Sequence, residues 1–319
     1  MNGIPVNPGA AVETAGAVRA GTGAPRAGTP ADGTTGVPAD TAAAGPDIPA
    51  GTAAGGPGVL SALRAAGAAE WVKLRTVRST FWLLLAAFAL SVGLAWLAGS
   101  GFRNGFSDLP AEQRESFDPL FAAFYGLTLG QLPLVALGVL AMGGEYSAGT
   151  IRPSLAAVPR RGVFYGAKLL AEAPLLLGAA LVTVPASFLV SQAALGPYGV
   201  SFGADGAVEA SAGACLYLVL IGLFATGVAA MLRGSALALG ILLPLLFLGS
   251  QGIGNVPALK PVAQYLPDQA AMVVMHLTGP PGDPRFGRPY DGWTGMGILL
   301  LWTAAALAGG YLVLRRRDA

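Results

Sequence analysis

Apolar residues gather in six long runs over the last three quarters of the chain, and polar stretches separate the runs. The runs cover residues 80–98, 120–142, 169–190, 211–232, 235–254 and 294–314. Each is close to the ~20 residues that an α-helix needs to cross about 30 Å of hydrocarbon. Only Arg233 and Gly234 separate the fourth run from the fifth, which predicts a tight hairpin. The pattern predicts an all-α integral membrane protein with six transmembrane helices.

An amphipathic stretch at residues 59–78 precedes the first apolar run. Its large apolar residues fall near one helical stripe, and charged residues occupy the remainder. The stripe consists of Leu60, Leu63, Trp71 and Leu74. This pattern is typical of a helix that lies in the membrane interface, and a soluble helix awaiting a partner is the alternative.

Residues 1–57 are rich in Ala, Gly, Pro and Thr and hold scarcely any large apolar residue. Such a segment buries too little apolar surface to offset the entropy lost on ordering, so we expect a disordered tail. No apolar h-region follows a basic start, so the segment does not resemble a signal peptide. The predicted domain boundary therefore separates this tail from a transmembrane domain at residues 58–319.

Composition supports the membrane assignment, because 54% of the 319 residues are hydrophobic and 11% are charged, against roughly 25% charged in soluble domains. A net charge of +2 is too small to indicate nucleic-acid binding. The single cysteine, Cys215, excludes a disulfide framework within the chain and a Cys-based zinc site.

The distribution of basic residues predicts the orientation, because cytoplasmic loops near span ends are enriched in Lys and Arg. One face would carry twelve basic residues, and the other would carry five together with nine acids. The richer face holds residues 59–78, the loop at 143–168, Arg233 and Arg315 to Arg317. We therefore expect a multi-pass protein of the cell membrane with both termini in the cytoplasm.

Two outer segments have local signals of their own. Residues 99–119 are acidic and polar, and we expect a solvated turn with a short helix between Pro110 and Phe117. Residues 257–277 are interrupted by two prolines and then become apolar, too short to cross a membrane. We expect short helices there that dip into the outer leaflet or pack on the bundle.

The sequence offers little that could carry catalysis. No Gly-x-x-x-x-Gly-Lys-Ser/Thr motif occurs, so the chain is not expected to bind ATP in the P-loop manner. The only histidine, His276, has no partner at metal-ligand spacing, and a serine nucleophile would have no other base. We expect no enzyme activity, metal or cofactor in this chain.

Glu172 is the one ionisable residue inside a predicted span, near the cytoplasmic end of that span. It follows Lys168 by four positions, which predicts an ion pair on one helix face. An intramembrane carboxylate is also typical of a proton relay, which is the alternative interpretation.

The loop at residues 143–161 is the most informative polar segment. Gly149 is expected to end the helix of the second span, and Pro153 to begin a new one with Arg152 outside helical geometry. Pro159 would end that helix, leaving residues 154–158 as a compact cytoplasmic knob. An ordinary positive-inside loop is the alternative, although it accounts for neither Glu145 nor the paired helix breaks.

The residues of this loop carry a family resemblance. Glu145, Gly149 with Thr150, Leu155, and Pro159 with a following arginine resemble the Glu-x-x-x-Gly-Thr…Leu…Pro…Arg signature of permease subunits of ABC-2 type exporters. The stretch AAEWVKLRTVRSTFW is similar to that family's N-terminal elbow helix, and YLPDQA to its re-entrant region. The resemblance covers roughly residues 59–317.

The resemblance implies a coupling helix between the second and third spans that docks on a separate ATP-binding subunit. The docking residues would be Glu145, Gly149, Thr150, Arg152, Leu155, Pro159, Arg160 and Arg161. The elbow helix would contribute Trp71, Lys73, Arg75 and Arg78, and the translocation path Thr128, Gln131 and Pro133.

The expected function is therefore export of a hydrophobic or amphipathic compound by a homodimer of this permease, driven by two copies of an ABC ATP-binding subunit that binds the ATP. The alternative is a non-transporting membrane anchor or regulatory module that recruits a cytoplasmic partner through the same basic face.

Overall fold

The computed structural model describes residues 58–316 except 251 and 281, and within these residues it contains helices and no strand. The predicted tail at residues 1–57 and the last basic residue, Arg317, lie outside the described residues.

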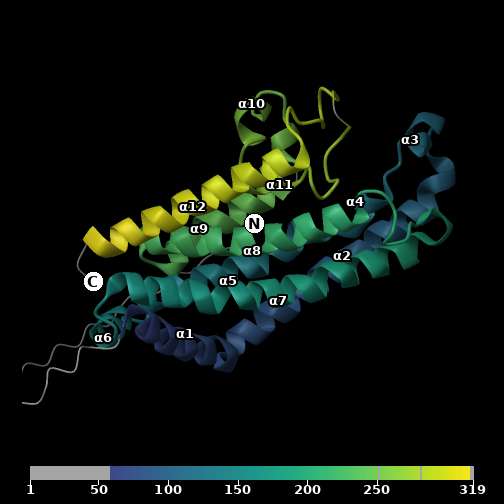
Figure 1. Cartoon of the computed structure of the whole chain (residues 1–319). Coiled ribbons are helices and arrows are strands. Elements are labelled where there is room, and N and C mark those ends of the chain that lie inside the picture. The colour runs from purple at the N-terminus through teal and green to yellow at the C-terminus, as the bar shows by residue number, and fades with distance from the viewer. Residues whose placement is uncertain (1–57, 251, 281, 317–319) are drawn as a thin grey trace, which may run out of the picture. The chain divides into compact units, whose positions relative to one another are not determined.

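Six helices that pack on one another form the bundle, which Figure 1 shows. They are α2 (Arg78–Gly105), α5 (Leu127–Ser147), α7 (Arg161–Leu195), α8 (Ala207–Leu232), α9 (Ser235–Ser250) and α12 (Gly292–Arg316). The other α-helices are α1 (Val59–Thr76), α3 (Ala111–Glu115), α4 (Pro119–Tyr125), α6 (Ile151–Ala157), α10 (Lys260–Ala263) and α11 (Pro267–Ala271). Three 3₁₀ turns, at Phe106–Asp108, Gly196–Tyr198 and Ile253–Asn255, lie in the connections.

Among the described residues, five helical segments are long and apolar enough to cross a membrane, which confirms an all-helical chain with the character of a membrane protein. The remaining long run is shorter than its apolar pattern predicts. The predicted span at 235–254 ends as a helix at Ser250, and Gly252 then adopts a left-handed φ of 93°. Its 16 residues measure about 24 Å, less than the hydrocarbon thickness.

Helix α8 lies at the centre, where it packs against α5, α7, α9 and α12. Small residues permit this close packing, as is usual between membrane helices. A Cβ on Gly138 of α5 would lie 2.3 Å from the backbone oxygen of Gly222, and a Cβ on Gly227 would lie 2.5 Å from the backbone of Ala306. Side chains larger than hydrogen at these two glycines would therefore push α5 or α12 away from α8.

The two ends of the bundle differ. Helices α1 and α6 and the C-terminal end of α12 lie at one end, and α3 and α4 lie at the opposite end (Figure 1). Helix α3 confirms the short helix predicted between Pro110 and Phe117. Helices α10 and α11 confirm short helices in the segment before the last span, and α11 is buried against α12. This distribution sets the predicted docking segments at one end, close to α1.

Candidate functional site

Helix α6 follows α5 through a three-residue turn. Gly149 has a φ of 70°, which glycine adopts without steric cost, and α5 ends at Ser147. This confirms the predicted helix stop. The helix that follows is Ile151–Ala157 and not 154–158.

The placement of Arg152 outside the helix is therefore wrong, because Arg152 is the second residue of α6 and Pro153 the third. The first four N–H groups of a helix have no acceptor within it, so a proline in the first turn removes no hydrogen bond.

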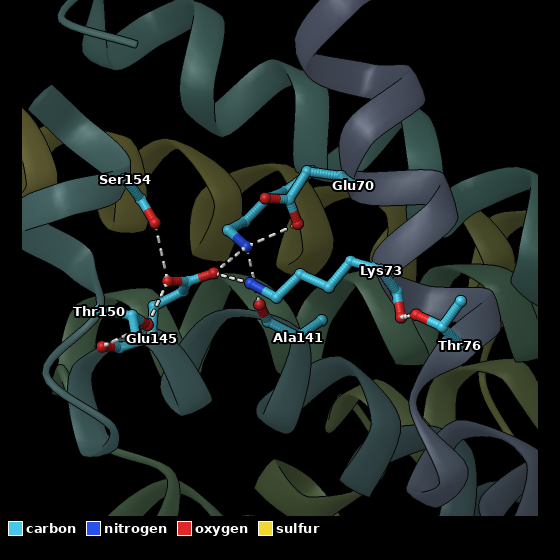
Figure 2. Close-up of polar contacts among 8 residues, drawn as sticks. Glu70, Lys73, Thr76, Ala141, Glu145, Thr150 and Ser154 are labelled. Atoms are coloured by element: carbon cyan, nitrogen blue, oxygen red, sulfur yellow. Dashed lines mark hydrogen bonds and ion pairs between the residues drawn. The ribbon is translucent and has the colours of Figure 1, made fainter. Parts of the chain in front are cut away.

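Glu145 lies in the last turn of α5 and is 2% exposed. Its Oε2 accepts hydrogen bonds from the hydroxyls of Thr150, at 2.6 Å, and Ser154, at 3.1 Å. Its Oε1 accepts from the ammonium groups of Lys73 and Lys168, the latter at 3.0 Å. Figure 2 shows Thr150, Ser154 and Lys73 converging on this carboxylate. Both oxygens are satisfied, so a charge that would be costly when buried is compensated.

Lys168 of α7 completes the arrangement and is also 2% exposed. Its Nζ lies 2.8 Å from Glu70 Oε2 of α1, 3.0 Å from Glu145 Oε1 and 3.2 Å from the backbone oxygen of Ala141. Three acceptors match the three N–H groups of an ammonium. We call the set Glu70, Lys73, Glu145, Thr150, Ser154 and Lys168 the carboxylate cluster.

The carboxylate cluster joins four helices. Glu70 and Lys73 come from α1, Glu145 from α5, and Lys168 from α7. Ser154 lies in α6, and Thr150 is the residue immediately before that helix. Two carboxylates and two ammonium groups make the cluster neutral, so its parts attract one another without leaving a net buried charge.

The predicted pairing of Lys168 with Glu172 is wrong. Lys168 pairs with Glu70 and Glu145, which come from other helices, whereas both Glu172 oxygens lie 2.7 and 2.8 Å from the Thr226 hydroxyl of α8. A Lys placed N-terminal to a Glu at this spacing is the weaker orientation on a helix. Two carboxylates from neighbouring helices are the stronger partners for its long side chain.

The other residues predicted to dock lie around the carboxylate cluster. Leu155 is half-buried against the core. The exposed ones are Gly149, Arg152, Pro159 and Arg160, and Thr150 of the cluster is exposed as well. Arg161 turns inward, where its Nη1 donates to the backbone oxygens of Leu314, at 2.7 Å, and Arg315, at 3.3 Å. Arg161 thus binds the last carbonyls of α12, a role that sequence spacing does not reveal.

On α1 the apolar stripe packs against α7, with Leu63 facing Gly166. Leu60 departs from the predicted stripe, being 76% exposed at the start of the helix. Trp71 is half-buried under Arg75, whose guanidinium lies 5.9 Å from the ring centre, and Arg78 is exposed at the start of α2.

The three residues predicted for a translocation path do not share a surface. Gln131 is fully buried, where its amide donates to the backbone oxygen of Thr128 and accepts from the Tyr217 hydroxyl. Thr128 is buried, and its hydroxyl donates to the backbone oxygen of Tyr125, the last residue of α4. Pro133 instead lines an apolar surface groove between α2, α5 and α9.

The opposite end contains an ion pair that the sequence did not predict, between His276 Nδ1 and Asp118 Oδ2 at 2.6 Å. Asp118 also caps α4, accepting from the Leu120 N–H at 2.9 Å. The hydrogen bond to Asp118 raises the pKa of His276 above its usual value despite burial. Burial raises the pKa of Asp118, but its hydrogen bonds with His276 and Leu120 outweigh this effect and lower the pKa overall.

Asp268 of α11 is a second buried polar residue at this end. Its Oδ2 accepts from the Gln269 amide at 2.8 Å, while its Oδ1 has no partner among the described residues. The described residues contain no group of three or more His, Cys, Asp or Glu that could hold a metal ion.

No protein-family model matches the chain, and no curated protein matches it.

Proposed function

We propose that this chain is the permease subunit of an ABC-2 type exporter. Two copies would work with two copies of a separate ABC ATP-binding subunit to move a hydrophobic or amphipathic compound across the cell membrane. The observation that carries the proposal is the link between the exposed helix α6 and the bundle through Glu145. A force applied to α6 reaches α1, α5 and α7 through one buried carboxylate.

Helix α6 has the properties that a docking element needs. It is short, its outer residues Arg152, Pro153 and Ala156 are exposed, and Ile151 anchors it in the core. A rigid element held in this way transmits a displacement as a rigid-body tilt of the helices it is attached to. The basic residues beside it support a cytoplasmic location for this end of the bundle.

Helix α9 would serve as the sixth crossing in this proposal. It packs along α5 and α8, and Ser235 at its start bonds Ser147 at the end of α5 at 2.8 Å. At its other end Gly249 lies against Asp268 of α11. The α11 segment would thus complete the span that the 16-residue helix leaves short of the ~20 residues required.

The test is ATP hydrolysis by an ABC ATPase encoded beside this gene, co-purified with the chain in lipid nanodiscs. The variant is Ala156→Glu on exposed α6, and the matched control is Ala111→Glu on α3, a short exposed helix at the opposite end. We expect the α6 variant to lower hydrolysis several-fold and the α3 variant to leave it unchanged.

Three outcomes separate the proposals. Loss of hydrolysis or of the complex with Ala156→Glu alone supports coupling through α6. If the complex is stable, neither variant changes its ATP hydrolysis and cells show no efflux, the membrane anchor is supported instead. Failure to co-purify with any such ATPase contradicts the permease assignment.

A further inference from the structure

A cleft of about 780 Å³ opens between the α1–α2 corner and helices α5 and α6. Helix α1 packs mainly against α7, and α2 leaves the corner at Val77, so the two helices diverge and leave this space between them. The volume is in the range of sites that hold drug-sized molecules. Thr150, Pro153, Ser154 and Ala157 of the α6 segment line one side of the cleft, but most of its wall is hydrocarbon.

The apolar wall comes from α1, α2 and α5. Its main residues are Leu74, Val77, Leu83, Leu137, Leu140 and Ala141. Leu140 is 37% exposed and Leu83 half-buried, so the wall continues onto the apolar outer surface of the bundle. A small hydrophilic ion would leave this wall in contact with water, whereas an acyl chain would cover it.

The polar groups of the cleft gather at the α1–α2 corner. The Lys73 ammonium donates to Glu145, but its side chain is 49% exposed and it has two further N–H groups. Thr80 is 8% exposed and lines the cleft, and its hydroxyl bonds no group among the described residues. The first N–H groups of α2 have no side-chain cap. The Thr80 N–H donates to the Val77 backbone oxygen at 3.1 Å. The donors that remain without an acceptor among the described residues are the Thr80 hydroxyl, the N–H groups of Arg78 and Ser79, and two N–H groups of Lys73.

The charges at the corner favour an anion. The last turn of α1 carries Lys73 and Arg75, α2 begins with Arg78, and neither turn contains an acid. Two carboxylates do line the cleft, Glu70 and Glu145, but the charges of Lys73 and Lys168 balance them, so Arg75 and Arg78 leave the corner positive. The N-terminal end of the 28-residue helix α2 adds the positive end of its dipole.

We propose that this cleft binds one membrane lipid with an anionic phosphate headgroup. The phosphate accepts hydrogen bonds from Lys73, Thr80 and the first N–H groups of α2, and one acyl chain lies along Leu83, Leu137 and Leu140. The site requires that the chain lie in a membrane, but it does not depend on the exporter proposal. Because Lys73 also holds Glu145, a bound lipid shares a cation with the carboxylate cluster.

The experiment is native mass spectrometry of the purified full chain in detergent, titrated with dioleoyl phosphatidylglycerol. Dioleoyl phosphatidylcholine and glycerol 3-phosphate are the comparison probes. The variants are Lys73→Gln, Thr80→Val and Leu140→Trp, which remove the cation, remove the hydroxyl and fill the apolar wall. Arg64→Gln is the matched control, because Arg64 is an exposed arginine on the same helix α1 and does not line the cleft.

We expect the native chain to bind one phosphatidylglycerol tightly. Lys73→Gln should bind it about tenfold less tightly, because the variant loses a charge-assisted hydrogen bond. Thr80→Val and Leu140→Trp weaken the same adduct, and Arg64→Gln does not. Equal binding of phosphatidylcholine, insensitive to Lys73 and Leu140, would mean unspecific annular lipid and overturn the proposal. Binding of glycerol 3-phosphate as tight as that of the lipid would overturn the role of the acyl chain. If Lys73→Gln fails to fold, Thr80→Val and Leu140→Trp decide between these outcomes.

Discussion

Lys168 Nζ lies 3.0 Å from Glu145 Oε1, and the two side chains are 2% and 1% exposed. This buried pair connects the third long helix of the bundle, α7, to the end of α5 from which α6 departs. A buried ion pair is weak evidence for stability, since desolvation offsets much of the attraction, but breaking one is strongly destabilising. The pair therefore fixes the position of α6 more than it strengthens the fold.

Replacing Lys168 by methionine should test this pair. We expect Lys168→Met to lower the free energy of unfolding by about 3 kcal/mol, because it leaves Glu145 and Glu70 with fewer partners in a buried position. Lys73→Met removes a cation that is 49% exposed, and exposed pairs contribute about 1 kcal/mol or less. Denaturation in detergent micelles would measure both variants, and equal losses would mean that Lys168 is not the central cation.

The hydroxyl of Thr226 is the hydrogen-bond partner of Glu172 in the centre of the bundle. Thr226→Val keeps the shape of the side chain and leaves the carboxyl without that partner. We expect a loss of about 1–3 kcal/mol in the free energy of unfolding. Ser211→Ala, which removes a buried hydroxyl that bonds only its own helix at Ala207, should cost less. The reverse order would show that Thr226 does not support Glu172.

The pair between His276 and Asp118 should make stability depend on pH. The raised pKa of His276 means that its contribution is complete below about pH 6.5, the unfolded value, and is lost as pH rises through the folded pKa. Asp118 has a lowered pKa, so its contribution is present above its unfolded value of 3.8 and is lost as pH falls through the folded value. The pair is therefore strongest between these limits.

The unfolding temperature between pH 5 and pH 9 measures this effect. We expect it to fall with rising pH in the native chain and to fall less in His276→Asn. Asparagine does not titrate and tolerates the left-handed backbone of this residue, whose φ is 57°. Parallel pH curves for the two proteins would show that another group, such as the nearby Glu209, determines the dependence.

Arg161 should hold the last turn of α12 through its bonds to Leu314 and Arg315. A cation at the C-terminal end of a helix also complements its dipole. We expect Arg161→Gln to reduce the local stability of that turn by about 1 kcal/mol, seen as faster amide hydrogen exchange in the last turn of α12. Arg160→Gln, one residue earlier and exposed, should leave that exchange unchanged.

Much of the fold follows from local patterns, which is why the sequence was informative. The apolar runs predicted the helices, the glycine at 149 predicted the end of α5, and prolines marked the short helices α3, α10 and α11. The helix predicted from the fifth apolar run was too long, and this error has a local cause too. The predicted run extended to position 254, but its last large apolar residue before the polar Ser250 and Gln251 is Leu248. Gly252 then turns the chain.

The polar contacts could not be predicted in the same way. Lys168 contacts Glu70, which is 98 positions earlier, and Glu172 contacts Thr226, which is 54 positions later. Such pairs depend on how helices pack, and a single sequence shows only neighbours along one helix. The signal that was available was the rarity of charge, because only 11% of the residues are charged. Glu145 and Lys168 are therefore few enough to be singled out, but their partners are not.

The most direct measurement of the central claim is cross-linking between α6 and the ATPase. Cys215 is the only cysteine of the chain, so a Cys215→Ser background allows a single new thiol at Ala156→Cys, with Ala111→Cys on α3 as the control. A short bifunctional reagent should join the thiol at residue 156, and not the thiol at residue 111, to the co-purified ATP-binding subunit. An intact complex in which residue 156 does not cross-link, or in which both positions do so equally, would contradict docking through α6.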